Sequence, residues 1–79
     1  MSPAEVDPRQ IVVHLDVLLT ARGLTLVDLA GHVGVTQVNL SILKNGRARA
    51  IRFSTLAKLC EVLECQPADL LSYRARPEG

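Results

Sequence analysis

The stretch that decides the fold is LVDLAGHVGVTQVNLSILKNG, residues 26–46 of the chain. Its first eight residues predict a short helix, because apolar side chains recur at three- and four-residue spacing in one stripe: Leu26, Leu29, Ala30 and Val33. Thr25 precedes this helix as a cap, and Asp28, three residues later, completes a capping-box pattern. Gly34 follows, at the point where the backbone must turn into left-handed space. The pattern therefore predicts a capped helix over Leu26–Val33 that ends in a tight turn.

A second short helix is expected directly after this turn, over Gln37–Lys44. Thr36 caps it, and Gly46 ends it. Leu40 and Leu43 form its buried stripe. An alanine four residues before the turn glycine allows the two helices to cross closely at a steep angle. This is the spacing of a helix-turn-helix unit, in which the second helix lies in the DNA major groove.

Three further helices are expected around this unit, over about Pro8–Arg22, Thr55–Leu63 and Pro67–Ser72. Asp7 before a proline is a good opening for the first, and Ser54 caps the second. The predicted fold class is therefore all-α, with five helices in a single domain over residues 8–72. An N-terminal arm over residues 1–7 precedes this domain, and a C-terminal tail over residues 73–79 follows it.

The core is expected to be aliphatic, because 48% of the 79 residues are hydrophobic and only one Phe and one Tyr are aromatic. Ile51 and Phe53 are expected to return to this core from the connection that follows the helix-turn-helix unit. Cys60 falls on the apolar stripe of the fourth helix, which favours a buried, reduced thiol.

The first predicted helix carries more apolar residues than one stripe can hold. Ile11, Leu15, Leu18 and the stem of Arg22 are expected to face inward. Four other apolar residues lie off that face: Val12, Val13, Val17 and Leu19. Two interpretations stay open. Either the N-terminal arm wraps this helix, or Val13, Val17 and Leu19 belong to a surface for self-association or for a partner protein.

The charge distribution is more informative than the net charge of +1. All eight acidic residues lie at or before Asp28, or at or after Glu61. Between them stand five basic residues with no acid to offset them: Lys44, Arg47, Arg49, Arg52 and Lys58. A cluster this small is commonly a solvated loop face. Its place directly after a candidate recognition helix nevertheless favours nucleic-acid binding.

Several function classes find no support in the sequence. No apolar run reaches the roughly 18 residues that a membrane span needs. The opening MSPAEVDPRQ is acidic and contains proline, unlike a secretory signal, so a cytoplasmic protein is expected. The spacing of the two cysteines and the distance between His14 and His32 fit no usual zinc site. Neither a metal nor another cofactor is therefore expected.

Enzymatic activity is not expected either. The chain has no paired carboxylates in a plausible pocket, no nucleophile with a base at recognisable spacing and no glycine-rich phosphate loop. A second domain that would sense a small molecule is not expected, and neither is an effector.

The chain from about Leu15 to Leu71 resembles the phage-repressor and Cro-type helix-turn-helix domain, the XRE group. Two segments carry the resemblance: LTLVDLAGHVGVTQVNLSILKNG and FSTLAKLCEVLECQPADLL. With one more residue, RFSTLAKLCEVLECQPADLL resembles a small subgroup of stand-alone bacterial regulators. The resemblance implies a lambda-repressor-like bundle. Two positions depart from the family pattern, since Leu26 replaces a frequent glutamine and Lys44 a frequent glutamate.

The resemblance also implies which residues meet DNA. Four at the start and middle of the second helix of the unit are expected to face the base edges: Gln37, Val38, Ser41 and Ile42. Glutamine can make a bidentate contact with adenine, and valine or isoleucine can pack on a thymine methyl group. A second set is expected to contact the DNA backbone: Thr25, Asn39, Lys44, Asn45, Arg47, Arg49 and Arg52. Such contacts fix the register of the protein but carry no sequence information.

Two function hypotheses from different classes follow. The first is a sequence-specific transcription regulator that binds double-stranded DNA as a homodimer, on half-sites one helical turn apart. The second is a protein-interaction module that keeps the fold and binds a partner protein through the apolar face of the first helix.

Overall fold

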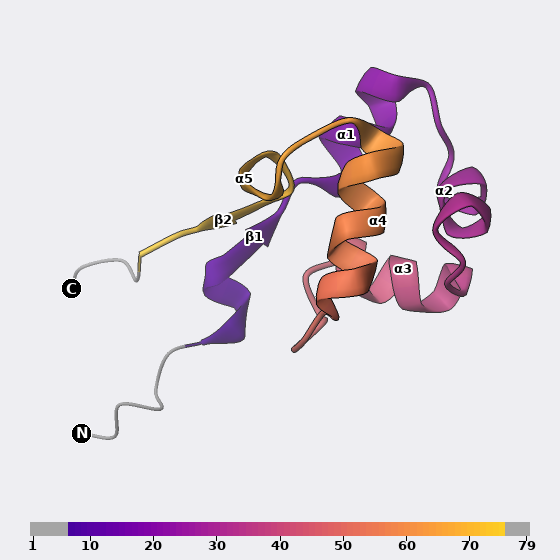
Figure 1. The fold of residues 1–79 in the computed structure, drawn as a ribbon. Helices are drawn as coiled ribbons and strands as arrows, with labels where there is room; N and C mark the ends of the chain where they lie inside the picture. The colour runs from indigo at the N-terminus through magenta and orange to yellow at the C-terminus, as the bar shows by residue number, and fades with distance from the viewer. Residues whose placement is uncertain (1–6, 76–79) are drawn as a thin grey trace.

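The computed structural model describes residues 7–75, and these form a mostly helical domain (Figure 1). Five α-helices are present: α1 (Leu15–Arg22), α2 (Leu26–Val33), α3 (Gln37–Lys44), α4 (Phe53–Leu63) and α5 (Pro67–Leu70). A short 3-10 helix, η1 (Pro8–Gln10), and two strands, β1 (Ile11–Val13) and β2 (Leu71–Tyr73), complete the fold. The predicted five-helix architecture with a helix-turn-helix formed by the second and third helices is confirmed.

The helix-turn-helix unit is built from local signals that the sequence carries. The Thr25 hydroxyl accepts a hydrogen bond from the Asp28 amide at 3.1 Å, and the Asp28 carboxylate accepts one from the Thr25 amide at 3.3 Å. Gly34 ends α2 with φ = 84°, in the left-handed region. The Thr36 hydroxyl then caps α3 by accepting from the Asn39 amide at 3.1 Å. As a result, α2 and α3 lie at 115° to each other.

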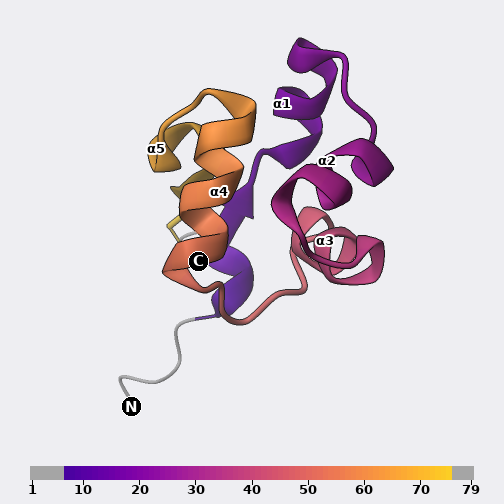
Figure 2. The ribbon, with the colours of Figure 1, turned by 45° about the vertical axis from the view of Figure 1, so that its right-hand side comes forward.

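Every α-helix contributes leucine to one aliphatic core. Nine residues are at most 8% exposed: Leu15, Leu19, Leu29, Ala30, Leu40, Leu43, Leu59, Leu63 and Leu70. No buried polar side chain was found within residues 7–75. In Figure 2, α2 and α3 lie on one side of α4, and α5 lies on the other. As a result, α3 packs its Leu40 and Leu43 side against the core and exposes the opposite side to solvent.

The prediction of one continuous helix over Pro8–Arg22 is wrong. Residues Ile11–Val13 form β1, which pairs antiparallel with β2 in the register Ile11↔Tyr73, Val12↔Ser72 and Val13↔Leu71. Three consecutive β-branched side chains favour this extended pairing over a helix. The last helix therefore ends at Leu70 instead of Ser72, and β2 includes the first residue of the predicted tail.

This β1–β2 ribbon also changes the expected apolar surface of the first helix. Ile11 was expected to face inward but is 44% exposed. Leu19 was expected on a partner surface but is a core residue, because it follows Leu15 by one helical turn on the same face of α1. Of the other two candidates, Val17 is exposed and Val13 packs partly against the core. The three predicted surface residues are thus not equivalent.

The start of α4 differs from the expectation as well. The helix begins at Phe53 and not after Ser54, and its first hydrogen bond joins the Leu56 amide to the Arg52 carbonyl at 2.9 Å. Ser54 therefore lies inside the helix and does not cap it. Phe53 is 85% exposed, since the first residue of this helix points away from the core that Ile51 helps to fill. The prediction of Phe53 as a core residue is wrong.

Cys60 lies in the last turn of α4 and Cys65 follows the end of that helix, and both are half-buried free thiols. The prediction of a buried thiol at Cys60 is therefore met only in part. Burial raises the pKa of the Cys65 thiol above its ordinary value, with a smaller effect from Cys60.

Among the described residues, no single helix is long and apolar enough to cross a membrane. Taken together, the bent pair α2–α3 is long and apolar enough to cross a membrane, by length and composition only.

The turn glycine allows a first prediction. Replacing Gly34 with alanine is expected to lower the free energy of unfolding by about 1–2 kcal/mol, because L-residues are strained in the left-handed region. No heavy atom lies within 4 Å of an added Cβ, so this cost comes from the backbone alone. Chemical denaturation followed by circular dichroism measures it.

Gly31 is the matched control, since it also has open space around an added Cβ but lies inside α2. Alanine there is expected to raise stability by about 0.5–1 kcal/mol through helix propensity. Equal effects at the two glycines would contradict the assigned turn.

Candidate nucleic-acid interface

The four predicted base-reading residues lie together on the outer face of α3. Gln37, Val38, Ser41 and Ile42 line one shallow hollow of about 330 Å³, together with Asn45 and Arg47. The opposite face of the same helix carries Leu40 and Leu43, which are buried. Val38 is 68% exposed and Ile42 is 39% exposed. The structure therefore brings the predicted reading face together and leaves two apolar side chains open on it.

Asn45 and Gly46 lead the chain from this face into the basic connection between α3 and α4. The Asn45 side-chain amide donates to the Ser41 hydroxyl at 3.4 Å. Gly46 adopts φ = 74°, and the Arg47 amide donates to the Ile42 carbonyl at 3.0 Å. These contacts position Arg47 at the edge of the reading face.

The connection itself forms a second, wider groove with α3. About 940 Å³ in volume, it is lined on one side by α3 residues that include Asn39 and on the other by Arg47, Arg49 and Arg52. All three arginines are exposed, and none has an ion-pair partner among residues 7–75. Since Arg47 lines both hollows, the basic groove is continuous with the reading face.

Two of the predicted backbone-contacting residues have other partners. The Lys44 ammonium lies 3.3 Å from the Asp16 carboxylate and is half-buried against α1. Thr25 is exposed, but its amide already donates to the Asp28 carboxylate at the start of α2. A carboxylate at that helix end takes the place of an anion, so the expected phosphate site there is weakened. Lys44 and Thr25 thus differ from Arg47, Arg49 and Arg52, which have no ion-pair partner in the described part of the chain.

Arg9 is a basic residue that the sequence did not point to. It lies in η1, and a hollow of about 270 Å³ joins Asp7, Pro8 and Arg9 to residues 46–49 of the basic connection. Figures 1 and 2 both show that connection passing beside the N-terminal turn. Only the pairing of β1 with β2 brings this turn to that place. No short-range signal could have revealed it.

A three-residue turn, a steep crossing of two short helices and an open face on the second helix define a helix-turn-helix DNA-binding domain. Comparison with known proteins agrees. The Cro/C1-type HTH DNA-binding domain family matches residues 14–76. The chain belongs to this family, which confirms the resemblance predicted from the sequence.

A relative in Bacillus subtilis (strain 168) is 52% identical over 65 residues, which cover 82% of this chain and 77% of the relative. That relative is described as an uncharacterized HTH-type transcriptional regulator, YozG. The aligned length is consistent with one shared domain that makes up most of both chains.

Proposed function

We propose that this protein is a transcription regulator that reads the DNA major groove with α3 and binds as a homodimer. The observation that carries the proposal is the continuity of the exposed reading face with three arginines that have no ion-pair partner among residues 7–75. The family supports DNA binding, and the regulator role is supported by the name of the Bacillus relative. An enzymatic role has no such support.

In this proposal the residues of the reading face have distinct roles. Gln37, at the N-terminal end of α3, forms two hydrogen bonds with an adenine edge. Val38 and Ile42 pack on thymine methyl groups, which explains why apolar side chains stand open on an otherwise polar face. Ser41 donates to or accepts from a neighbouring base. Together these contacts would supply the sequence preference.

The backbone contacts come from the groove beside this face. Arg47, Arg49 and Arg52 each neutralise a phosphate, while Asn39 and Asn45 contact phosphate or sugar oxygens. Three neutralised phosphates correspond to a slope of about −2.7 for log affinity against log salt in each half-site. Lys44 remains with Asp16 and Thr25 with the α2 cap, so neither is counted.

The homodimer follows from the small size of the reading surface. One α3 helix reads few base pairs, and two copies about 34 Å apart would read half-sites one DNA turn apart. With Leu19 in the core, we place the contact at the β1–β2 ribbon, where Ile11 and Tyr73 are exposed cross-strand neighbours. These two line an apolar groove of about 490 Å³ beside Ala50 and Ile51 of the basic connection. Arg49 also lines this groove, so a second copy seated there lies directly beside the basic connection.

The experiment that tests the DNA-binding proposal is the replacement of Arg47 by alanine. Arg47→Ala is expected to weaken binding to all duplexes alike and to reduce the salt slope by about 0.9, the effect of one lost phosphate contact. Fluorescence anisotropy over a range of salt concentrations measures both quantities.

Lys58→Ala is the charge-matched control. Lys58 lies on α4 in an exposed ion pair with Glu61, and it lines neither the two hollows beside α3 nor the hollow beside the N-terminal turn. Its loss is expected to leave the salt slope unchanged. Identical slopes for Arg47→Ala and Lys58→Ala would show that the basic connection does not face DNA.

A further inference from the structure

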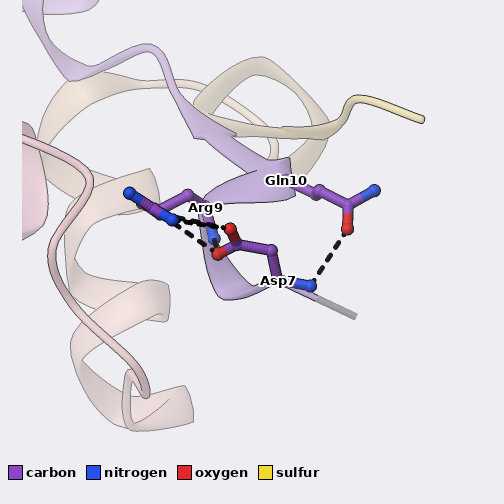
Figure 3. Close-up of polar contacts among 3 residues, drawn as sticks. All are labelled: Asp7, Arg9 and Gln10. Atoms are coloured by element: carbon purple, nitrogen blue, oxygen red, sulfur yellow. Dashed lines mark hydrogen bonds and ion pairs between the residues drawn. The ribbon is translucent and has the colours of Figure 1, made fainter. Parts of the chain in front are cut away.

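The N-terminal turn holds an arginine in a closed ion pair. The Arg9 Nη2 atom lies 2.9 Å from Asp7 Oδ2, and Arg9 Nε lies 3.2 Å from both carboxylate oxygens. The same carboxylate accepts a hydrogen bond from the Arg9 backbone amide at 2.9 Å. The Gln10 side-chain oxygen accepts one from the Asp7 backbone amide at 3.0 Å (Figure 3). The pair is therefore fixed by the cap of η1.

The position of this turn relative to the body of the domain is also fixed. The Arg74 amide donates to the Gln10 carbonyl at 2.7 Å, and the β1–β2 pairing begins at the next residue. The hollow beside the turn reaches Arg47 and Arg49. Asp7 is thus the one described carboxylate in this hollow, facing Arg9, Arg47 and Arg49.

These neighbours stabilise the charged form of the Asp7 carboxyl group. The hydrogen bonds from Arg9 hold the pKa of the Asp7 carboxyl below its ordinary value, with a smaller contribution from Arg49. The carboxylate is therefore ionised at neutral pH. It repels phosphate at the same place where the arginines attract it.

The geometry points to Arg9 as a further phosphate-binding residue that Asp7 withholds from DNA. The inference rests on the proposed function. The Arg9 side chain is 81% exposed, so an incoming phosphate can reach it without any change in the core. In the wild-type protein the Asp7 carboxylate holds this guanidinium and repels phosphate. Once the charge of Asp7 is removed, a phosphate oxygen can take the place of the carboxylate.

Asp7→Asn tests this inference directly, because asparagine caps a helix as well as aspartate does but carries no charge. The variant is expected to bind every duplex more tightly and to have a salt slope steeper by about 0.9, the effect of one added phosphate contact. The ratio of variant to wild-type affinity is then expected to fall about 3.5-fold between about 50 and 200 mM salt.

The double variant Asp7→Asn/Arg9→Ala separates a released arginine from the simple loss of a negative charge. Its salt slope is expected to return to the wild-type value. A slope that stays steep without Arg9 would overturn the inference. Glu61→Gln, which also frees a basic partner from an exposed ion pair, is the matched control and is expected to change nothing.

Failure of the inference and failure of the proposed function are distinguishable. If wild-type protein shows no salt-sensitive binding at low ionic strength, the proposed function fails. If wild-type protein binds and Asp7→Asn has the wild-type slope, only the role of Arg9 is contradicted. Denaturation curves of both variants show whether the cap and the fold are preserved.

Discussion

Replacing Leu29 with alanine is expected to lower the free energy of unfolding by about 2–5 kcal/mol. Leu29 is 0% exposed and lies on α2, the helix that packs against both α3 and α4. Removing its side chain loses buried apolar contacts and leaves a cavity in a small core, in which nine residues of the described range 7–75 are buried. Urea unfolding followed by circular dichroism at 222 nm, a wavelength sensitive to helix, measures the loss.

Val27→Ala is the matched control on the same helix. Val27 is 58% exposed, and alanine has the higher helix propensity, so the change is expected to stay within about 0.5 kcal/mol. A comparable loss at both positions would mean that α2 does not present Leu29 to the core. The predicted effect concerns stability, and wild-type-like DNA binding is expected wherever the variant remains folded.

Replacing Gln37 with alanine is expected to cost about 1–3 kcal/mol in binding to the preferred site and much less on other duplexes. Gln37 is exposed at the first position of α3, so its loss leaves the core intact. The reason for the selectivity is that a bidentate contact to one base edge distinguishes that base from the other three. Competition between preferred and scrambled duplexes measures the specificity ratio.

Arg47→Ala is the natural comparison, because it removes a phosphate contact and is expected to lower affinity for both duplexes equally. The two variants should therefore change different quantities. An unchanged specificity ratio for Gln37→Ala would contradict the assignment of α3 as the reading helix, even if overall binding survived.

The helix-turn-helix unit could be predicted from the sequence because its signals are local. The observed bounds of α2 and α3, Leu26–Val33 and Gln37–Lys44, are those predicted. Each cap is formed by a side chain within three residues of its partner, and each stripe lies on a single helix. Such short-range hydrogen bonds and periodicities need no knowledge of the rest of the chain.

The ribbon could not be predicted in this way. Ile11–Val13 continues an apolar pattern that is compatible with a helix, and only the partner strand Leu71–Tyr73, some sixty residues away, makes it extended. The same limit applies to Phe53, whose exposure depends on where α4 begins relative to the core.

In the candidate site too, features within one helix could be predicted from the sequence, whereas contacts between distant segments could not. The reading face was predictable because Gln37, Val38, Ser41 and Ile42 share one side of one helix, and the structure brings them together. Lys44 was predicted to contact the DNA backbone from its place beside the basic connection, and its ion pair with Asp16 could not be predicted because Asp16 lies on another helix. The position of Arg9 beside the basic connection could not be predicted either, since the residues that share its hollow are distant in sequence.

Selection of bound duplexes from a random pool tests sequence-specific binding by this protein without a known operator or a variant. Wild-type protein is expected to enrich duplexes with two inverted half-sites, their centres one helical turn or about 10 base pairs apart. Retention is expected to weaken steeply with added salt. A pool that remains random, with no salt-sensitive retention at low ionic strength, would rule out a DNA-reading regulator and favour a protein-interaction role.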